Sequence, residues 1–185
     1  KVLCWVAVDR AIKIAHLFNI YEYSLQWSQL RDTIKHDIMQ KGWNSKIESF
    51  TQSYGGVDLD ASNLLFEPYG FISADDPMYI STVRKTYQQL CVDGLMYRYI
   101  NNDDFGKPVS SFTVCTFWMI DSLFKIGEKE KAVELFKNIL SLSNHLGLYS
   151  EDINIRTKEL MGNFPQGYSH LALINTAITL SQYKK

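Results

Sequence analysis

Residues 112–145 read FTVCTFWMIDSLFKIGEKEKAVELFKNILSLSNH and contain the two kinds of helix that recur along the chain. The segment up to residue 124 is apolar nearly all round, which is typical of a helix buried on every side. From residue 128 to residue 145, apolar side chains repeat on one side and charged side chains occupy the other, which is typical of a helix at the surface. The stretch therefore predicts a buried helix followed by a surface helix.

The same alternation extends in both directions from this stretch. Apolar helical segments begin near residues 2, 58, 111 and 169, and amphipathic segments lie at 24–41 and 77–90. The apolar segments recur roughly every 55 residues, a pattern typical of stacked helical hairpins that cannot bury their apolar faces alone. We expect an all-α fold of alternating inner and outer helices, forming a single domain over residues 1–185. Such an array would be an incomplete ring if the architecture is a closed toroid.

Composition and charge narrow the class of protein. The 185 residues carry a net charge of −1, so no basic surface indicates nucleic-acid binding, and the apolar start has no signal-peptide cleavage pattern or membrane span. The three cysteines, Cys4, Cys91 and Cys115, are widely spaced in apolar surroundings and are expected to be reduced core residues of a cytoplasmic protein. No metal-ligand spacing of Cys or His appears, and no cofactor is predicted.

The longer irregular connections all follow an outer helix and precede an inner one. They cover residues 52–60, 97–111 and 147–170, so we expect them to gather at one end of the array. Long loops on a rigid scaffold often carry function. This end of the molecule is therefore the predicted position of a site.

Carboxylates, an arginine and tyrosines on these loops suit a neutral, polyhydroxylated ligand. A guanidinium offers parallel donors to adjacent hydroxyl groups, and glycoside hydrolysis requires carboxyl groups as acid and base. The candidates are Tyr54, Tyr97, Arg98, Glu151, Asp152 and Gln166. No Ser/His/Asp triad, phosphate loop or zinc motif competes with this interpretation.

Each candidate also has a structural interpretation. Ser150, Glu151 and Asp152 could cap a helix, and Arg98 could pair with Asp103 or Asp104. Tyrosines such as Tyr54 and Tyr97 could simply pack in the core. These alternatives stay open from the residues alone.

Short motifs along nearly the whole chain resemble bacterial and archaeal members of glycoside hydrolase family 15, the family of glucoamylases, glucodextranases and some trehalases. They are Trp5–Ala11, Gln52–Gly55, Leu59–Ser62, Gly94–Tyr99, Cys115–Trp118, Leu146–Glu151, Gly162–Gln166 and Ser169–Asn175. The resemblance implies an (α/α)6 toroid and an inverting, exo-acting hydrolysis of α-linked glucosides, glucoamylase-like or, as the alternative, a trehalase. A non-catalytic carbohydrate-binding or scaffold fragment is the third possibility.

The resemblance also implies roles for residues. Glu151 matches the general base and Arg98 the arginine that holds the non-reducing glucose, whereas the implied general acid would precede residue 1. We therefore expect the 185 residues alone to be nearly inactive. We also expect an open flank exposing Leu3, Val6 and Phe117, which would favour self-association or docking of a missing N-terminal half.

Overall fold

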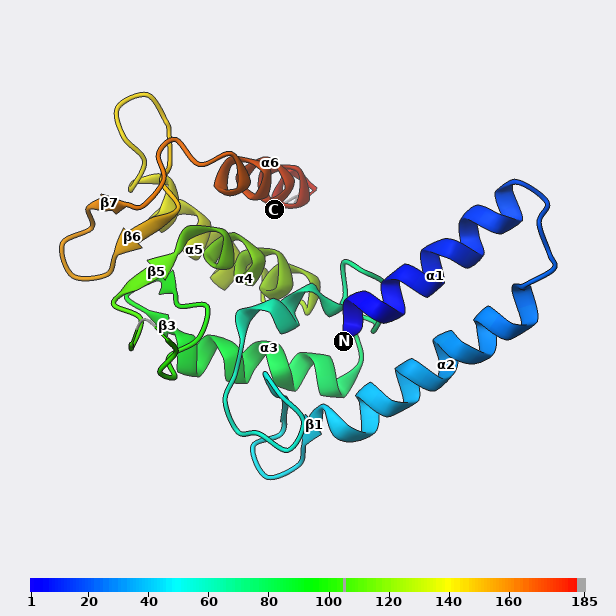
Figure 1. The fold of residues 1–185 in the computed structure, drawn as a ribbon. Coiled ribbons are helices and arrows are strands. Elements are labelled where there is room, and N and C mark those ends of the chain that lie inside the picture. Colours follow the sequence, from blue (N-terminus) through cyan, green and yellow to red (C-terminus); the bar gives the residue numbers. More distant parts are fainter. Residues whose placement is uncertain (105, 183–185) are drawn as a thin grey trace.

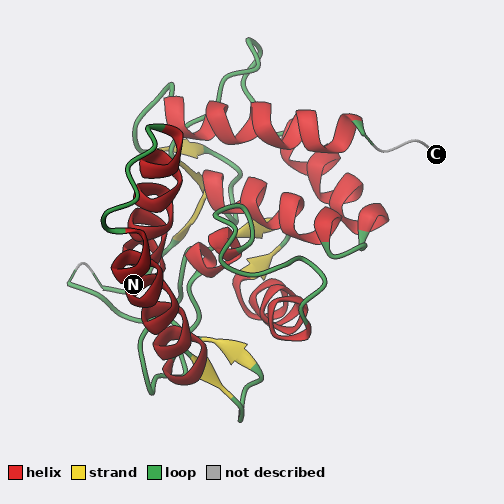
Figure 2. Ribbon diagram, turned by 90° about the vertical axis from the view of Figure 1, so that its right-hand side faces the viewer, coloured by secondary structure: helices red, strands yellow, loops and turns green. Residues whose placement is uncertain are grey.

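The computed structural model describes residues 1–104 and 106–182. Helices make up most of this part of the chain, with short antiparallel strands between them (Figures 1 and 2). The helices are α1 (Val2–Leu17), α2 (Ser24–Lys41), the 3₁₀-helix η1 (Ala61–Phe66), α3 (Pro77–Leu90), α4 (Thr113–Lys125), α5 (Lys129–Leu140) and α6 (Gly167–Ser181). The strands are β1 (Trp43–Asn44), β2 (Ser49–Phe50), β3 (Cys91–Val92), β4 (Leu95–Met96), β5 (Ser110–Phe112), β6 (Asp152–Asn154) and β7 (Leu160–Met161).

The predicted all-α architecture and the alternation of helices are confirmed. The segments expected to be inner are α1, η1, α4 and α6, and the first three are each followed in the chain by an expected outer helix, α2, α3 or α5. Helix α4 is the centre of the packing, because it contacts α5, α6, α3 and η1. Closure of the array into a toroid stays a prediction.

Capping residues set several helix starts. The Asp76 carboxylate accepts from the Met78 N–H at 2.8 Å, and Pro77 occupies the first helical position of α3. Asp60 caps η1 by accepting from the Ser62 N–H at 2.8 Å. Helix α2 begins at Ser24 without a side-chain cap, and the Ser24 hydroxyl lies 3.3 Å from His16 Nε2.

The core is continuous from the start of α1 to α6. A run of edge-to-face aromatic contacts joins Trp5 to Phe71, Phe71 to Phe66 and Phe66 to Phe50, with ring centroids 5.3–5.4 Å apart. Phe117 is fully buried and meets the Tyr149 ring edge-on at 5.8 Å. The expectation that Phe117 lies on an exposed flank is therefore wrong, because α5 and α6 cover α4.

The α1–α2 hairpin projects from the rest of the structure (Figure 1). The expected exposure of Leu3 on α1 is confirmed, and Val6 is half-buried. Ile14 and Leu17 are exposed as well, although this apolar helix was expected to take a buried, inner place. Cys4 is exposed as well, which corrects its assignment to the core, while Cys91 is half-buried and Cys115 buried. The reason is that α1 packs mainly on α2 and meets the remaining structure through its N-terminal half, where Trp5 contacts Phe71 and Arg10 donates to the Tyr69 carbonyl.

Helix α6 has the same character at the other end of the array. Its Leu171, Ile174 and Ile178 are exposed, whereas Ala172 and Thr176 are buried against its neighbours. The exposed apolar surface of the inner helices thus lies on α1 and α6 and not on α4.

One helix boundary differs from prediction. Helix α5 ends at Leu140 instead of continuing to residue 145, because the chain turns at Ser141, whose hydroxyl donates to the Asn138 carbonyl at 2.7 Å.

Among the described residues, no helix is long and apolar enough to cross a membrane, and no group of three His, Cys, Asp or Glu side chains is placed to hold a metal ion.

Candidate functional site

The three-stranded sheet β5–β6–β7 positions Glu151. Strand β6 lies between β5 and β7, with Asp152 opposite both Phe112 and Met161. Glu151 immediately precedes β6, and its backbone carbonyl accepts from the N–H of Thr113, the first residue of α4, at 2.9 Å. Asp152 therefore begins a strand, and the alternative in which Ser150, Glu151 and Asp152 cap a helix is wrong.

In the preceding helical hairpin, Arg98 occupies the position that corresponds to Glu151. Its backbone carbonyl accepts from the N–H of Ala61, the first residue of η1, at 2.8 Å. In both cases a loop residue satisfies a free N–H at the start of the preceding inner helix. This shared backbone arrangement brings Arg98 and Glu151 to the same end of the array.

A cleft of about 480 Å³ lies between these two residues. Its lining comprises Arg98, Tyr99, Asp103, Gly106, Lys107, Pro108, Val109, Ser110, Phe112, Glu151 and Asp152. The volume is within the range of ligand pockets, about 300–1,000 Å³. Three of the six residues predicted from the sequence, Arg98, Glu151 and Asp152, therefore meet in one cleft.

Arg98 pairs with a buried carboxylate and still reaches the cleft. Its Nε lies 3.6 Å from Oδ1 of Asp60, and its guanidinium carbon lies 5.7 Å from the centre of the Tyr99 ring. The ion pair of Arg98 is thus with Asp60, an aspartate that the alternative interpretation did not name. Because 51 % of the side chain is exposed, the guanidinium can donate further hydrogen bonds to hydroxyl groups in the cleft.

The environment of the Asp152 carboxylate differs from that of the adjacent Glu151 carboxylate. It is half-buried, and the Ser110 hydroxyl donates a hydrogen bond to it across the β5–β6 pair. Burial raises the pKa of Asp152, the Ser110 hydrogen bond lowers it, and the charge of Glu151 raises it, so that the pKa lies above its usual value. Asp152 therefore keeps its proton to a higher pH than a solvated aspartate.

Glu151 is half-buried and its carboxylate is held from one side. Nδ2 of Asn163 donates to Oε2 of Glu151 at 2.8 Å, and the Asn163 backbone N–H donates to the same oxygen at 3.3 Å. The backbones are joined too, since the Glu151 N–H donates to the Asn163 carbonyl at 2.9 Å. A carboxylate that is fixed at one oxygen and faces a cleft suits a base that takes a proton from water.

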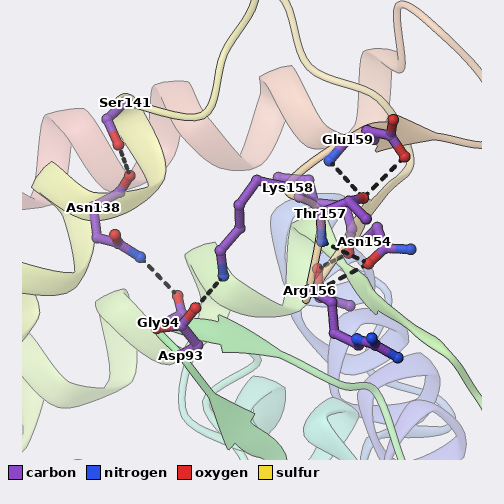
Figure 3. Close-up of polar contacts among 11 residues, drawn as sticks. Asp93, Gly94, Asn138, Ser141, Asn154, Arg156, Thr157, Lys158 and Glu159 are labelled. Atoms are coloured by element: carbon purple, nitrogen blue, oxygen red, sulfur yellow. Dashed lines mark hydrogen bonds and ion pairs between the residues drawn. The ribbon is translucent and has the colours of Figure 1, made fainter.

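The far end of the β6–β7 hairpin is tied to the β3–β4 turn (Figure 3). Lys158 forms an ion pair with Asp93, and Nδ2 of Asn138 on α5 reaches the Gly94 carbonyl at 3.5 Å. Oδ1 of Asn154 closes the hairpin turn by accepting from the backbone N–H of Arg156 at 2.9 Å. These contacts anchor the hairpin whose other end carries Glu151.

The remaining predicted residues lie outside this cleft. Tyr54 lines a separate cavity of about 250 Å³ beside the start of α1, where its hydroxyl donates to Oδ2 of Asp37 at 2.8 Å. Burial and the Asp37 carboxylate raise the pKa of Tyr54 to about 12. Tyr97 is half-buried against the core, and Gln166 precedes α6, where its N–H donates to the Tyr149 carbonyl at 2.9 Å. Their roles in binding stay predictions.

The structure adds residues that were not predicted. Lys107, Ser110 and Phe112 line the cleft, and Asn163 holds the Glu151 carboxylate. Ser110 and Phe112 could not be found from periodicity because β5 spans only three residues. Asn163 belongs to one of the short motifs quoted above, although that motif alone gave it no role.

The sequence model of Glycosyl hydrolases family 15 matches residues 1–178. The chain is 41 % identical over 181 residues to a trehalase of Mycobacterium tuberculosis and 37 % identical over 183 residues to a trehalase of Thermoplasma volcanium. These matches cover 96 and 98 % of the chain but only 26 and 29 % of the relatives, so the chain spans between a quarter and a third of their length.

Solved structures agree on the fold. A glycosidase and a variant of a glycosidase in complex with glucose superpose with TM-scores of 0.73 and 0.77, at 17 and 16 % sequence identity. The superpositions cover 86 and 92 % of this chain and 45 and 48 % of those chains.

Proposed function

This chain belongs to Glycosyl hydrolases family 15, and from that premise we propose that it is part of an inverting, exo-acting α-glucosidase in which Glu151 is the general base. In an inverting glycosidase, one carboxylic acid protonates the leaving oxygen and a carboxylate on the opposite face activates a water molecule. The 185 residues supply the second group. The general acid implied by the resemblance is not among them.

The proposal gives each residue of the cleft a role. Glu151 takes a proton from the attacking water through the carboxylate oxygen that Asn163 leaves free. Arg98 holds hydroxyl groups of the non-reducing glucose by donating from its exposed guanidinium. Asp152, whose pKa is raised by burial, supplies a hydroxyl donor at acidic pH and a carboxylate acceptor at higher pH.

Trehalose is the substrate that the relatives favour. Proteins named trehalase are 37–41 % identical to this chain over nearly its whole length. A glucoamylase-type substrate, which was the first interpretation of the motifs, becomes the second candidate. Both are α-glucosides with a non-reducing glucose, so Arg98 and Glu151 keep the same roles in either case.

The observation that supports the proposal most directly is the shared cleft of Arg98 and Glu151. Calorimetric titration of the chain with trehalose, maltose and glucose tests it. We expect binding that Arg98→Ala abolishes and Arg84→Ala, a change in an exposed arginine on α3, leaves intact. Absence of binding to any of the three sugars would sink the proposal and favour a scaffold role.

Turnover is a separate expectation. A positioned general acid contributes on the order of 10²–10⁴ in rate, so we propose that these residues alone release glucose from trehalose or maltose at most very slowly. Appreciable turnover that Glu151→Gln abolishes would show that the acid lies within the 185 residues after all.

A further inference from the structure

Residues Gly162 and Asn163 form a cradle around one side of the Glu151 carboxylate. Two donors of Asn163, the side-chain Nδ2 and the backbone N–H, converge on the same oxygen, Oε2, at 2.8 and 3.3 Å. The Asn163 carbonyl accepts the Glu151 N–H at 2.9 Å. The cradle therefore fixes both the backbone of Glu151 and the orientation of its side chain.

Gly162 makes this approach sterically possible. Its φ of +75° lies in the left-handed region, and a Cβ built on it would lie 3.1 Å from Oε2 and 3.2 Å from Cβ of Glu151. Gly147, in the same connection, has a similar φ of +76°, but its Cβ would meet nothing within 4 Å. The two glycines thus share a backbone conformation and differ only in whether a side chain would collide with Glu151.

We propose that Asn163 is a positioning residue that turns the Glu151 carboxylate so that Oε2 is occupied by the cradle and Oε1 faces the ligand and its attacking water. This inference rests on the proposed function, because it presumes that Glu151 meets a glucoside in the cleft. Charge-assisted hydrogen bonds to a carboxylate are among the stronger ones in proteins. Loss of the shorter of the two hydrogen bonds, that from Nδ2, lets the carboxylate rotate away without removing its charge.

The test uses a pair of glucose-sized probes, glucose and the iminosugar 1-deoxynojirimycin. The iminosugar carries a protonated amine at the position of the ring oxygen, so a well-oriented Glu151 carboxylate favours it over neutral glucose. The ratio of the two dissociation constants therefore reports on the orientation of Glu151. A general loosening of the cleft affects both sugars and leaves the ratio unchanged.

We expect Asn163→Ala to lower this preference for the iminosugar about tenfold, the effect of one charge-assisted hydrogen bond. Glu151→Gln should lower it similarly, and the double variant should lower it no further than Glu151→Gln alone, because Asn163 acts only through Glu151. Asn154→Ala, which weakens the turn of the same hairpin without touching Glu151, should keep the ratio within twofold of the original chain.

The glycines provide a second, independent pair of variants. Gly162→Ala should lower the preference by collision with Glu151, whereas Gly147→Ala carries the same backbone strain and should leave the preference intact. Urea unfolding of each variant checks that it is folded. Equal weakening of both sugars by Asn163→Ala, an additive double variant, or the same drop in ratio for Gly147→Ala would each overturn the inference. Failure of the original chain to bind either sugar would instead refute the proposed function, and the inference with it.

Discussion

Asp121 on α4 gives the chain a pH-dependent stability whose size can be worked out from the structure. Its side chain faces α6, and its Oδ1 atom is buried with no hydrogen-bond partner among residues 1–104 and 106–182. Burial raises the pKa of Asp121 to about 6 from 3.8, while Thr176 and Lys125 oppose the shift. Folding therefore favours the protonated, neutral form of the Asp121 carboxyl.

The sign follows from linkage. Between pH ~4 and ~6 the unfolded chain has lost this proton while the folded chain keeps it, so folding stability falls as pH rises through this window and stays lower above it. With the two pKa values given, the loss is about 3 kcal/mol by pH 7, and about 2 kcal/mol of it develops between pH 4.5 and pH 7.

The perturbation is Asp121→Asn, which keeps the shape of the side chain and removes its ionisation. Urea unfolding at pH 4.5 and pH 7 should show the free energy of unfolding of the variant, relative to the original chain, rising by about 2 kcal/mol between the two pH values. Asp58→Asn, at an exposed aspartate, serves as the control and should show little change. The reasoning is refuted if the difference between Asp121→Asn and the original chain is the same at both pH values or decreases with pH.

Three further outcomes are expected. Phe117→Ala should destabilise the chain by about 3–5 kcal/mol in urea unfolding, because the ring is fully buried; a loss below about 1 kcal/mol would contradict its central place in the core. Arg98→Lys should weaken glucose binding in calorimetric titration, because an ammonium cannot offer two parallel donors, and an unchanged affinity would remove Arg98 from the binding site. The exposed apolar faces of α1 and α6 should cause self-association, seen as a mass that rises with concentration in light scattering and falls on Leu171→Glu; a clean monomer at high concentration would count against it.

The order and kind of the helices could be predicted because hydrophobic periodicity is a local property. The segment around Phe117 and the segment around Leu171 are both apolar nearly all round, so both read as buried. Only Phe117 is buried, because α4 packs against α3, α5, α6 and η1, whereas α6 packs mainly against α4. The number of neighbours is set by the place of a helix in the array, which periodicity does not encode.

The candidate site divides in the same way. The rule that loops after outer helices gather at one end correctly brought Arg98 and Glu151 together. The rule does not say where around that end each loop lies, so it did not predict that Tyr54 lines a different cavity beside α1. Strands of two or three residues, such as β5, are too short to show a periodic pattern, so the contact of Ser110 with Asp152 could not be predicted from the sequence.

The backbone explains why the site can be both repetitive and specific. The carbonyls of Arg98 and Glu151 accept from the first N–H groups of η1 and α4, and such bonds depend on the position of a residue and not on its side chain. The repeated arrangement therefore brings a side chain to the cleft from each of these two hairpins but leaves its orientation open. An arginine tolerates this, because its five donors can reach hydroxyl groups from several angles. A general base does not, since one carboxylate oxygen must face one water molecule. Under the proposed roles, a residue such as Asn163, which holds the side chain as well as the backbone, is needed at the Glu151 position and not at the Arg98 position.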